Sequence, residues 1–161
     1  MVPVNRILVP TDFSPASKQA LRYACNLADV FGSAVTIINV LENPFARIAS
    51  SEMYGPPPVQ FLEELERRSR GELEAQLTAE EKAKYSATFI LRTGAPAHEI
   101  LDYLNEPGGI DLVVMATAGR GGVARLVMGS VAEKIVRAAP CPVLTLHPFD
   151  RVATEPDDRA A

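Results

Sequence analysis

The sequence contains very few of the residues that build disulfide and metal sites. Its 161 residues include two cysteines, Cys25 and Cys141, which are too few for a disulfide framework and have no metal-ligand spacing. The two histidines, His98 and His147, lie far apart and belong to no ligand pattern, which argues against zinc. We therefore expect no metal site, and two buried thiols in the reducing cytoplasm.

Other absences exclude further classes of protein. The net charge of −4 leaves no basic excess for a nucleic-acid partner. No apolar run approaches the length of a transmembrane helix, and the first residues lack the layout of a signal peptide. There is no G-K-[ST] of a P-loop kinase, no Ser-His-Asp set and no activated cysteine. The sequence therefore predicts no membrane or nucleic-acid partner and no catalytic residue.

What the sequence does contain is a regular alternation of strand and helix patterns. Residues 15–31 repeat apolar side chains at helical spacing between Ser14, a predicted N-cap, and Gly32, a predicted helix end. A single amphipathic helix is predicted from Val59 to about Lys84, with charges that indicate a solvated face. Further helices are predicted from Pro96 and over residues 131–139, and strands over residues 6–10, 34–40, 87–92, 112–115 and 143–147.

Strands that alternate with helices predict a parallel sheet with helices on both faces. We expect one α/β domain over residues 1–148, a three-layer sandwich with a five-stranded sheet in a flavodoxin-like or Rossmann-like arrangement. The polar residues 149–161 are predicted to be a disordered tail. Ligands of such sheets bind at the carboxyl ends of the strands, where the strand order reverses. If the first and fourth strands are neighbours, the loops after them border one cleft.

The loop after the fourth predicted strand is rich in glycine. It runs from Gly119 to Gly122 and leads to Gly129 and Ser130 at the start of a helical pattern. Glycines beyond a strand allow backbone N–H groups to approach an anion, and a helix N-terminus adds N–H donors and a favourable dipole. These features predict a phosphate site. The same loop also fits G-x-G-x-x-A, but it follows the wrong strand for a dinucleotide-dependent oxidoreductase, and the acidic residue that motif requires is missing.

Several segments together resemble the universal stress protein family over residues 3–148. Nucleotide-binding members carry Gly, two residues, Gly, nine residues, and then Gly-Ser or Gly-Thr. Here Gly119, Gly129 and Ser130 match this pattern, and Ala116 stands in place of the first glycine. The segments that carry the resemblance are ILVPTDFS at 7–14, GAP at 94–96, GSVAE at 129–133 and APCPV at 139–143.

The resemblance implies a cytoplasmic stress-response protein that binds ATP, with Mg²⁺ held through the phosphates. It implies that Asp12 lies near the ribose or adenine and that Val40 contributes to the adenine pocket. Simpler interpretations stay open, since Asp12 and Ser130 could cap helices, Gly129 could be a packing glycine, and Met115 could be sheet core. The predicted nucleotide-binding residues are Pro10, Thr11, Asp12, Val40, Met115, Ala116, Gly119, Arg120, Gly122, Gly129, Ser130 and Val131.

Two functional hypotheses follow. The first is an ATP-binding protein with slow hydrolysis at most, for which ATP, AMP and other adenine nucleotides all remain open. The second is a nucleotide-free, dimeric interaction module of the stress response. Under either hypothesis, the last strand, Val143 to His147, lies at a sheet edge in the family's strand order and carries no charge. We therefore predict a homodimer in which two copies of this strand meet antiparallel about a twofold axis.

Overall fold

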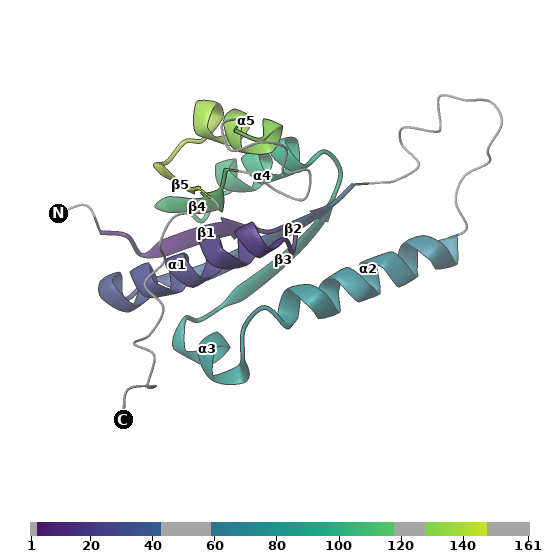
Figure 1. Ribbon diagram of the computed structural model, residues 1–161, viewed down its shortest axis with the longest axis horizontal. Coiled ribbons are helices and arrows are strands. Elements are labelled where there is room, and N and C mark those ends of the chain that lie inside the picture. The colour runs from purple at the N-terminus through teal and green to yellow at the C-terminus, as the bar shows by residue number, and fades with distance from the viewer. Residues whose placement is uncertain (1–2, 43–58, 118–127, 148–161) are drawn as a thin grey trace.

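The computed structural model describes residues 3–42, 59–117 and 128–147. Their strands form one parallel sheet in the order β3-β2-β1-β4-β5 (Figure 1). This confirms the predicted α/β class. The order is Rossmann-like rather than flavodoxin-like, because β2 and β3 lie on one side of β1 while β4 and β5 lie on the other. The strands are β1 (Arg6–Pro10), β2 (Ala34–Leu41), β3 (Thr88–Thr93), β4 (Leu112–Ala116) and β5 (Val143–Leu146).

The first helix begins and ends where the sequence predicts. The Ser14 side chain accepts a hydrogen bond from the Ser17 N–H, and Pro15 occupies the first turn. Gly32 ends the helix in the left-handed conformation, at φ 71°, which glycine adopts at no steric cost. The helices are α1 (Pro15–Phe31), α2 (Val59–Glu74), α3 (Ala79–Lys84), α4 (Pro96–Asn105) and α5 (Ser130–Ala138).

The prediction of one helix from Val59 to about Lys84 is wrong, because α2 ends at Glu74 and α3 starts at Ala79. A capping box explains the break. The Thr78 side chain accepts from the Glu81 N–H, and the Glu81 carboxylate accepts from the Thr78 N–H. The turn also carries Leu77 into the core, where it is 4% exposed.

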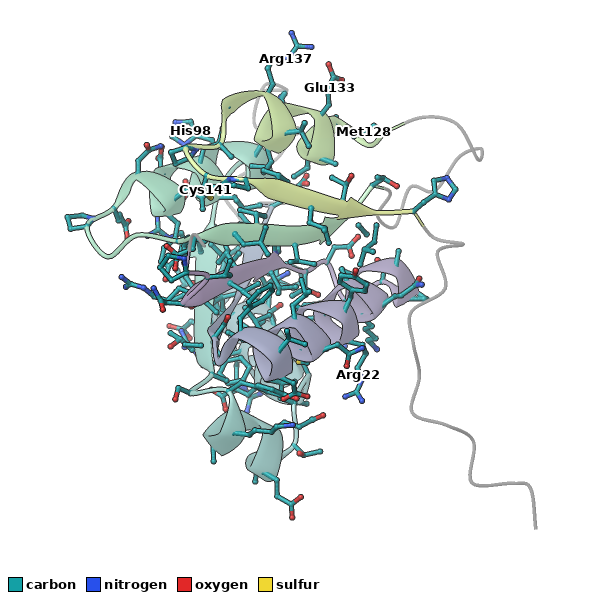
Figure 2. The ribbon with its side chains drawn as sticks, turned by 90° about the vertical axis from the view of Figure 1, so that its left-hand side faces the viewer. Arg22, His98, Met128, Glu133, Arg137 and Cys141 are labelled. Carbon is teal, nitrogen blue, oxygen red and sulfur yellow. The ribbon has the colours of Figure 1, made fainter. Side chains whose placement is uncertain are left out.

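Alternate residues of the strands supply two apolar cores, one on each face of the sheet. Helices α1 and α2 cover one face, and α4 and α5 cover the other (Figure 1). Ile7, Val9 and Val114 belong to the first core, and Leu8 and Val113 to the second. Both outer surfaces are charged: Figure 2 shows Arg22 of α1 and the pair Glu133 and Arg137 of α5 pointing away from the sheet.

The two cysteines differ in their surroundings. Cys25 is buried on α1, and burial raises the pKa of its thiol to about 11. Cys141 is only partly buried, so the expectation of two buried thiols is wrong for this residue. Burial, followed by the charge of Asp111, raises the pKa of its thiol. Within the described ranges, no helix combines the length and the apolar character needed to span a bilayer.

Candidate functional site

The strand order reverses between β1 and β4. These two strands are direct neighbours, with Ile7 opposite Leu112 and Leu8 opposite Val113. Each is followed by a helix, so the N-termini of α1 and α5 both lie at the carboxyl edge of the sheet. The strand adjacency on which the prediction of one cleft depends is therefore present, and two positive helix-dipole ends lie at the same edge. Residues 118–127 of the loop after β4 lie outside the described residues.

Local hydrogen bonds hold the loop between β1 and α1 in place. The Asp12 Oδ1 accepts from the Ser14 N–H at 3.1 Å, and the Thr11 Oγ1 accepts from the Phe13 N–H at 3.1 Å. Phe13 has a φ of 65°, a conformation that bulky residues rarely adopt. Such strain persists only where surrounding contacts enforce it, and it is common at functional sites. The structure thus gives Asp12 the helix-supporting role considered from the sequence, at an edge that also suits a ligand.

The start of α5 is tied to the end of β4. The Gly129 N–H donates to the Thr117 carbonyl at 2.6 Å, directly beyond the last residue of β4, Ala116. Gly129 is the N-cap of α5, with φ −62°, so it does not need the positive φ that only glycine readily adopts. Ser130 is the exposed first residue of the helix, so the interpretation of Ser130 as the N-cap is wrong.

The predicted site residues differ in how much of each is exposed. Asp12 and Val40 are partly buried at the ends of β1 and β2, and Val131 is partly buried on α5. Pro10 and Met115 are buried, and the Met115 side chain packs in the core on the α4 and α5 face. That packing matches the alternative of a sheet-core methionine and leaves only its backbone at the edge. The predictions for Gly119, Arg120 and Gly122 lie outside the described residues.

Three polar residues at this edge were not predicted from the sequence. Ser17 lies in the first turn of α1, and its Oγ is 3.1 Å from the Thr11 Oγ1. Thr117 accepts the Gly129 N–H, as described above. Asn39 is 5% exposed on β2, and its Nδ2 donates to the Thr11 carbonyl at 2.8 Å. An asparagine inside an otherwise apolar, β-branched run is a signal that could have identified Asn39.

The site presents helix N-termini that can bind an anion, and its described residues form no metal-binding cluster. Among the residues that the structure describes, no three His, Cys, Asp or Glu side chains gather to hold an ion. The unpaired backbone N–H groups of a helix's first turn point toward its N-terminal end and favour negative charge. The edge can therefore bind an anionic group through backbone amides and hydroxyls, with Asp12 as a hydrogen-bond acceptor nearby.

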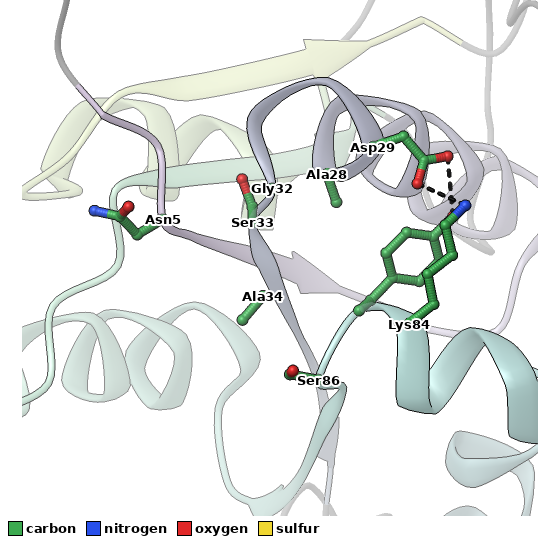
Figure 3. A pocket seen from close by; sticks show the side chains of 9 residues that line it. Asn5, Ala28, Asp29, Gly32, Ser33, Ala34, Lys84 and Ser86 are labelled. Carbon is green, nitrogen blue, oxygen red and sulfur yellow. Dashed lines mark hydrogen bonds and ion pairs between the residues drawn. The ribbon is translucent and has the colours of Figure 1, made fainter.

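A hollow of about 380 Å³ lies at the opposite, amino edge of the sheet, between the end of α1 and the end of α3 (Figure 3). Its charged side chains bind one another. The Lys84 Nζ lies 2.7 Å from the Asp29 Oδ1, and the Tyr85 hydroxyl donates to the Asp29 Oδ2 at 3.2 Å. The hydrogen bond from Lys84 lowers the pKa of the Asp29 carboxyl. We regard this hollow as a structural anchor, since its charged side chains, Asp29 and Lys84, already bind each other.

Comparisons with known proteins agree with the fold. Universal stress protein MJ0531 of Methanocaldococcus jannaschii is 33% identical over 145 residues, covering 88% of this chain and 81% of that protein. YxiE of Bacillus subtilis is 32% identical over 147 residues, covering 89% and 99%. The solved universal stress protein UspA from Lactobacillus plantarum superposes with a TM-score of 0.67 at 25% identity, covering 91% and 99%.

A sequence model of one family matches nearly the whole described domain. The match runs over residues 3–147, and the model is that of the universal stress protein family. It includes the segments that run from the end of β1 into α1 and from β4 into α5. The chain belongs to the universal stress protein family.

Proposed function

We propose that the protein binds an adenine nucleotide, ATP with Mg²⁺, at the carboxyl edge of the sheet, in the cleft between the loops after β1 and β4. The observation that carries the proposal is the adjacency of β1 and β4 at the reversal of strand order, where two helices begin. Sheets of this class bind ligands at that point. In this proposal the phosphates meet Ser130 and the start of α5, and Asp12 accepts a hydrogen bond from a ribose hydroxyl.

Relatives of the same fold support an adenine nucleotide. One solved universal stress protein is a complex with cAMP, and another, from Archaeoglobus fulgidus, is a complex with dAMP. Their identities to this chain are 20% and 18%, so we take from them the class of ligand and not the contacts. Mg²⁺ would be held by the phosphates and water. The protein would act in the stress response through its nucleotide-bound state.

The direct experiment is mass spectrometry of the small molecule released when freshly purified protein is denatured, followed by thermal unfolding with added MgATP. Ligand at a hundredfold its dissociation constant stabilises a fold by about 2.7 kcal/mol, which raises the Tm of a domain of this size by several degrees. Ser130→Ala is the matched variant, because alanine suits the first turn of a helix and removes only the hydroxyl. It should reduce the shift in Tm while leaving the unliganded Tm unchanged. If no nucleotide is released and millimolar MgATP does not shift the Tm, the proposal fails and the alternative, a nucleotide-free interaction module, is favoured.

We also propose a homodimer through β5, which in the described part of the chain pairs with β4 alone. Leu144 and Leu146 pack in the core on the α1 face, so charges there would disrupt folding rather than assembly alone. The carbonyls of Pro142 and Leu146 face β4, so the backbone of Thr145 faces the free side. Thr145→Pro removes this outward N–H and leaves the bonds to β4 intact. We expect monomers by light scattering with little change in Tm. An unchanged dimer would contradict this interface.

A further inference from the structure

Asn39 is a buried polar side chain in the core strand β2, at the carboxyl edge of the sheet. It is 5% exposed, and its neighbours Ile37 and Ile38 are fully apolar and buried. Its Nδ2 donates to the Thr11 carbonyl at 2.8 Å, whereas its Oδ1 accepts no hydrogen bond from any residue in the described ranges. Only the amide nitrogen can donate to a carbonyl, so this orientation of the side chain is fixed by its partner.

The bond from Asn39 lies where the backbone ladder between β1 and β2 stops. The two strands pair from Arg6 opposite Ala34 to Pro10 opposite Ile38, and the last backbone bond runs from the Thr11 N–H to the Ile38 carbonyl at 2.9 Å. In a continued parallel ladder the next bond would run from the Val40 N–H to the Thr11 carbonyl. That bond does not occur in the described part of the chain, where the Asn39 amide binds the Thr11 carbonyl.

We propose that Asn39 is a positioning residue for the nucleotide site. By binding the Thr11 carbonyl it stops the ladder one step early, which leaves the Val40 backbone N–H outside the sheet's own hydrogen bonds and available to a ligand. It also fixes the position of Thr11, whose hydroxyl contacts Ser17 and accepts the Phe13 N–H, and so fixes the loop that carries Asp12. This inference rests on the proposed function and adds to it a residue that never touches the nucleotide.

Stability alone does not account for an asparagine at this position. A buried acceptor without a donor destabilises the folded state, whereas an apolar side chain of similar size would pack against the surrounding core without that cost. Removing one partner of a buried hydrogen bond is costly mainly when the other partner is left without a bond. Here the Thr11 carbonyl would gain the Val40 N–H as a new donor. A variant with leucine in place of Asn39 should therefore fold well, and its Val40 N–H should bind the Thr11 carbonyl.

The test compares Asn39→Leu with the wild type and with Ile37→Leu, a repacking control on the same face of β2. We expect Asn39→Leu to match or exceed the wild type in its midpoint of urea unfolding. We expect its dissociation constant for MgATP to rise roughly tenfold, as for the loss of one well-placed hydrogen bond. Hydrogen exchange at the Val40 amide should slow, because the N–H joins the ladder. Ile37→Leu should change neither the affinity nor the exchange.

Asn39→Asp supplies a second, isosteric measurement. An ionised carboxylate cannot donate to the Thr11 carbonyl, whereas a protonated one can. Burial raises the pKa of a carboxyl group, so protonation occurs at an accessible pH. The affinity of Asn39→Asp for MgATP, divided by that of the wild type at the same pH, should rise as the pH falls. A ratio that is independent of pH would count against the donor role.

The outcomes separate the two proposals. If the wild type binds no nucleotide, the proposed function fails, and exchange at Val40 alone then decides the role of Asn39. Equal exchange at Val40 in the wild type and Asn39→Leu would overturn the inference. It would also be overturned if Asn39→Leu lost stability and affinity together, since the residue would then be merely structural.

Discussion

At the amino edge of the sheet, the Asp111 Oδ2 accepts the N–H groups of both Asn5 and Arg6, at 2.8 and 2.9 Å. At the carboxyl edge, by contrast, the buried Asn39 Oδ1 has no partner among the described residues. The amino edge uses its polar groups to join the ends of strands. The carboxyl edge keeps an unsatisfied buried acceptor, a feature that natural proteins retain mainly at functional sites.

Charged side chains follow the same division. Near the amino edge, Asp29 and Lys84 bind each other. That contact lowers the pKa of the Asp29 carboxyl and raises the pKa of the Lys84 ammonium, so both charged forms are favoured. At the carboxyl edge, the N-termini of α1 and α5 supply partial positive charge with backbone amides. Substitutions at the two edges should therefore affect different measurements: stability at the amino edge and ligand affinity at the carboxyl edge.

The largest effect should come from Gly129→Val at the carboxyl edge. A β-branched side chain at the N-cap of α5 would occupy the space where the proposed phosphates approach the backbone. We expect the affinity for MgATP to fall by roughly a hundredfold or more, equivalent to about 2.7 kcal/mol by calorimetry. The backbone at φ −62° and ψ 149° suits valine, so the fold should lose only about 1 kcal/mol, from the poorer cap. The affinity of Gly129→Ala for MgATP should lie between those of Gly129→Val and the wild type. Equal affinity in Gly129→Val and the wild type would show that this glycine is structural.

The second prediction concerns Asp111→Ala at the amino edge. The substitution leaves the N–H groups of Asn5 and Arg6 without their charged acceptor. We expect the free energy of unfolding in urea to fall by about 2 kcal/mol, with unchanged affinity for MgATP in the folded protein. Asp111→Asn keeps a neutral acceptor in place and should lose less. A clear loss of affinity for MgATP in folded Asp111→Ala would contradict the division between the two edges.

The smallest effects should come from the capping box of α3. Thr78→Ala removes the acceptor for the Glu81 N–H and should cost about 1 kcal/mol of stability, with no change in nucleotide affinity. Thr78→Ser keeps the hydroxyl and serves as the control. If Thr78→Ala were as stable as the wild type, the break between α2 and α3 would have another cause.

Glu81 adds a pH dependence to the same motif. The hydrogen bond from the Thr78 N–H, followed by the contact with Arg22, lowers the pKa of the Glu81 carboxyl in the folded protein. Its contribution is therefore fully present above the unfolded pKa and is lost as the pH falls through the folded pKa. Glu81→Gln should be less stable than the wild type at pH 7 by a few tenths of a kcal/mol, as for an exposed ion pair. The two proteins should converge in acid. A difference that persists at low pH would contradict this assignment.

Most of the elements and the class of the fold could be predicted from the sequence, because the signals for them are local. Ser14 and Gly32 fixed both ends of α1, because caps act through local hydrogen bonds and backbone conformation. The β-branched runs fixed the strands, and their alternation with helices fixed a parallel sheet. The capping box at Thr78 was also local and readable in the sequence, but the continuous amphipathic pattern around it obscured the break.

The neighbours of each strand, and the partners of the polar groups at the carboxyl edge, depend on tertiary packing. The adjacency of β1 and β4 joins segments that are about a hundred residues apart, and no local pattern encodes it. The bond from Asn39 to the Thr11 carbonyl likewise joins two strands at one register. Burial removes water as an alternative partner, so the fate of each such polar group depends on the packed neighbours that folding brings to it.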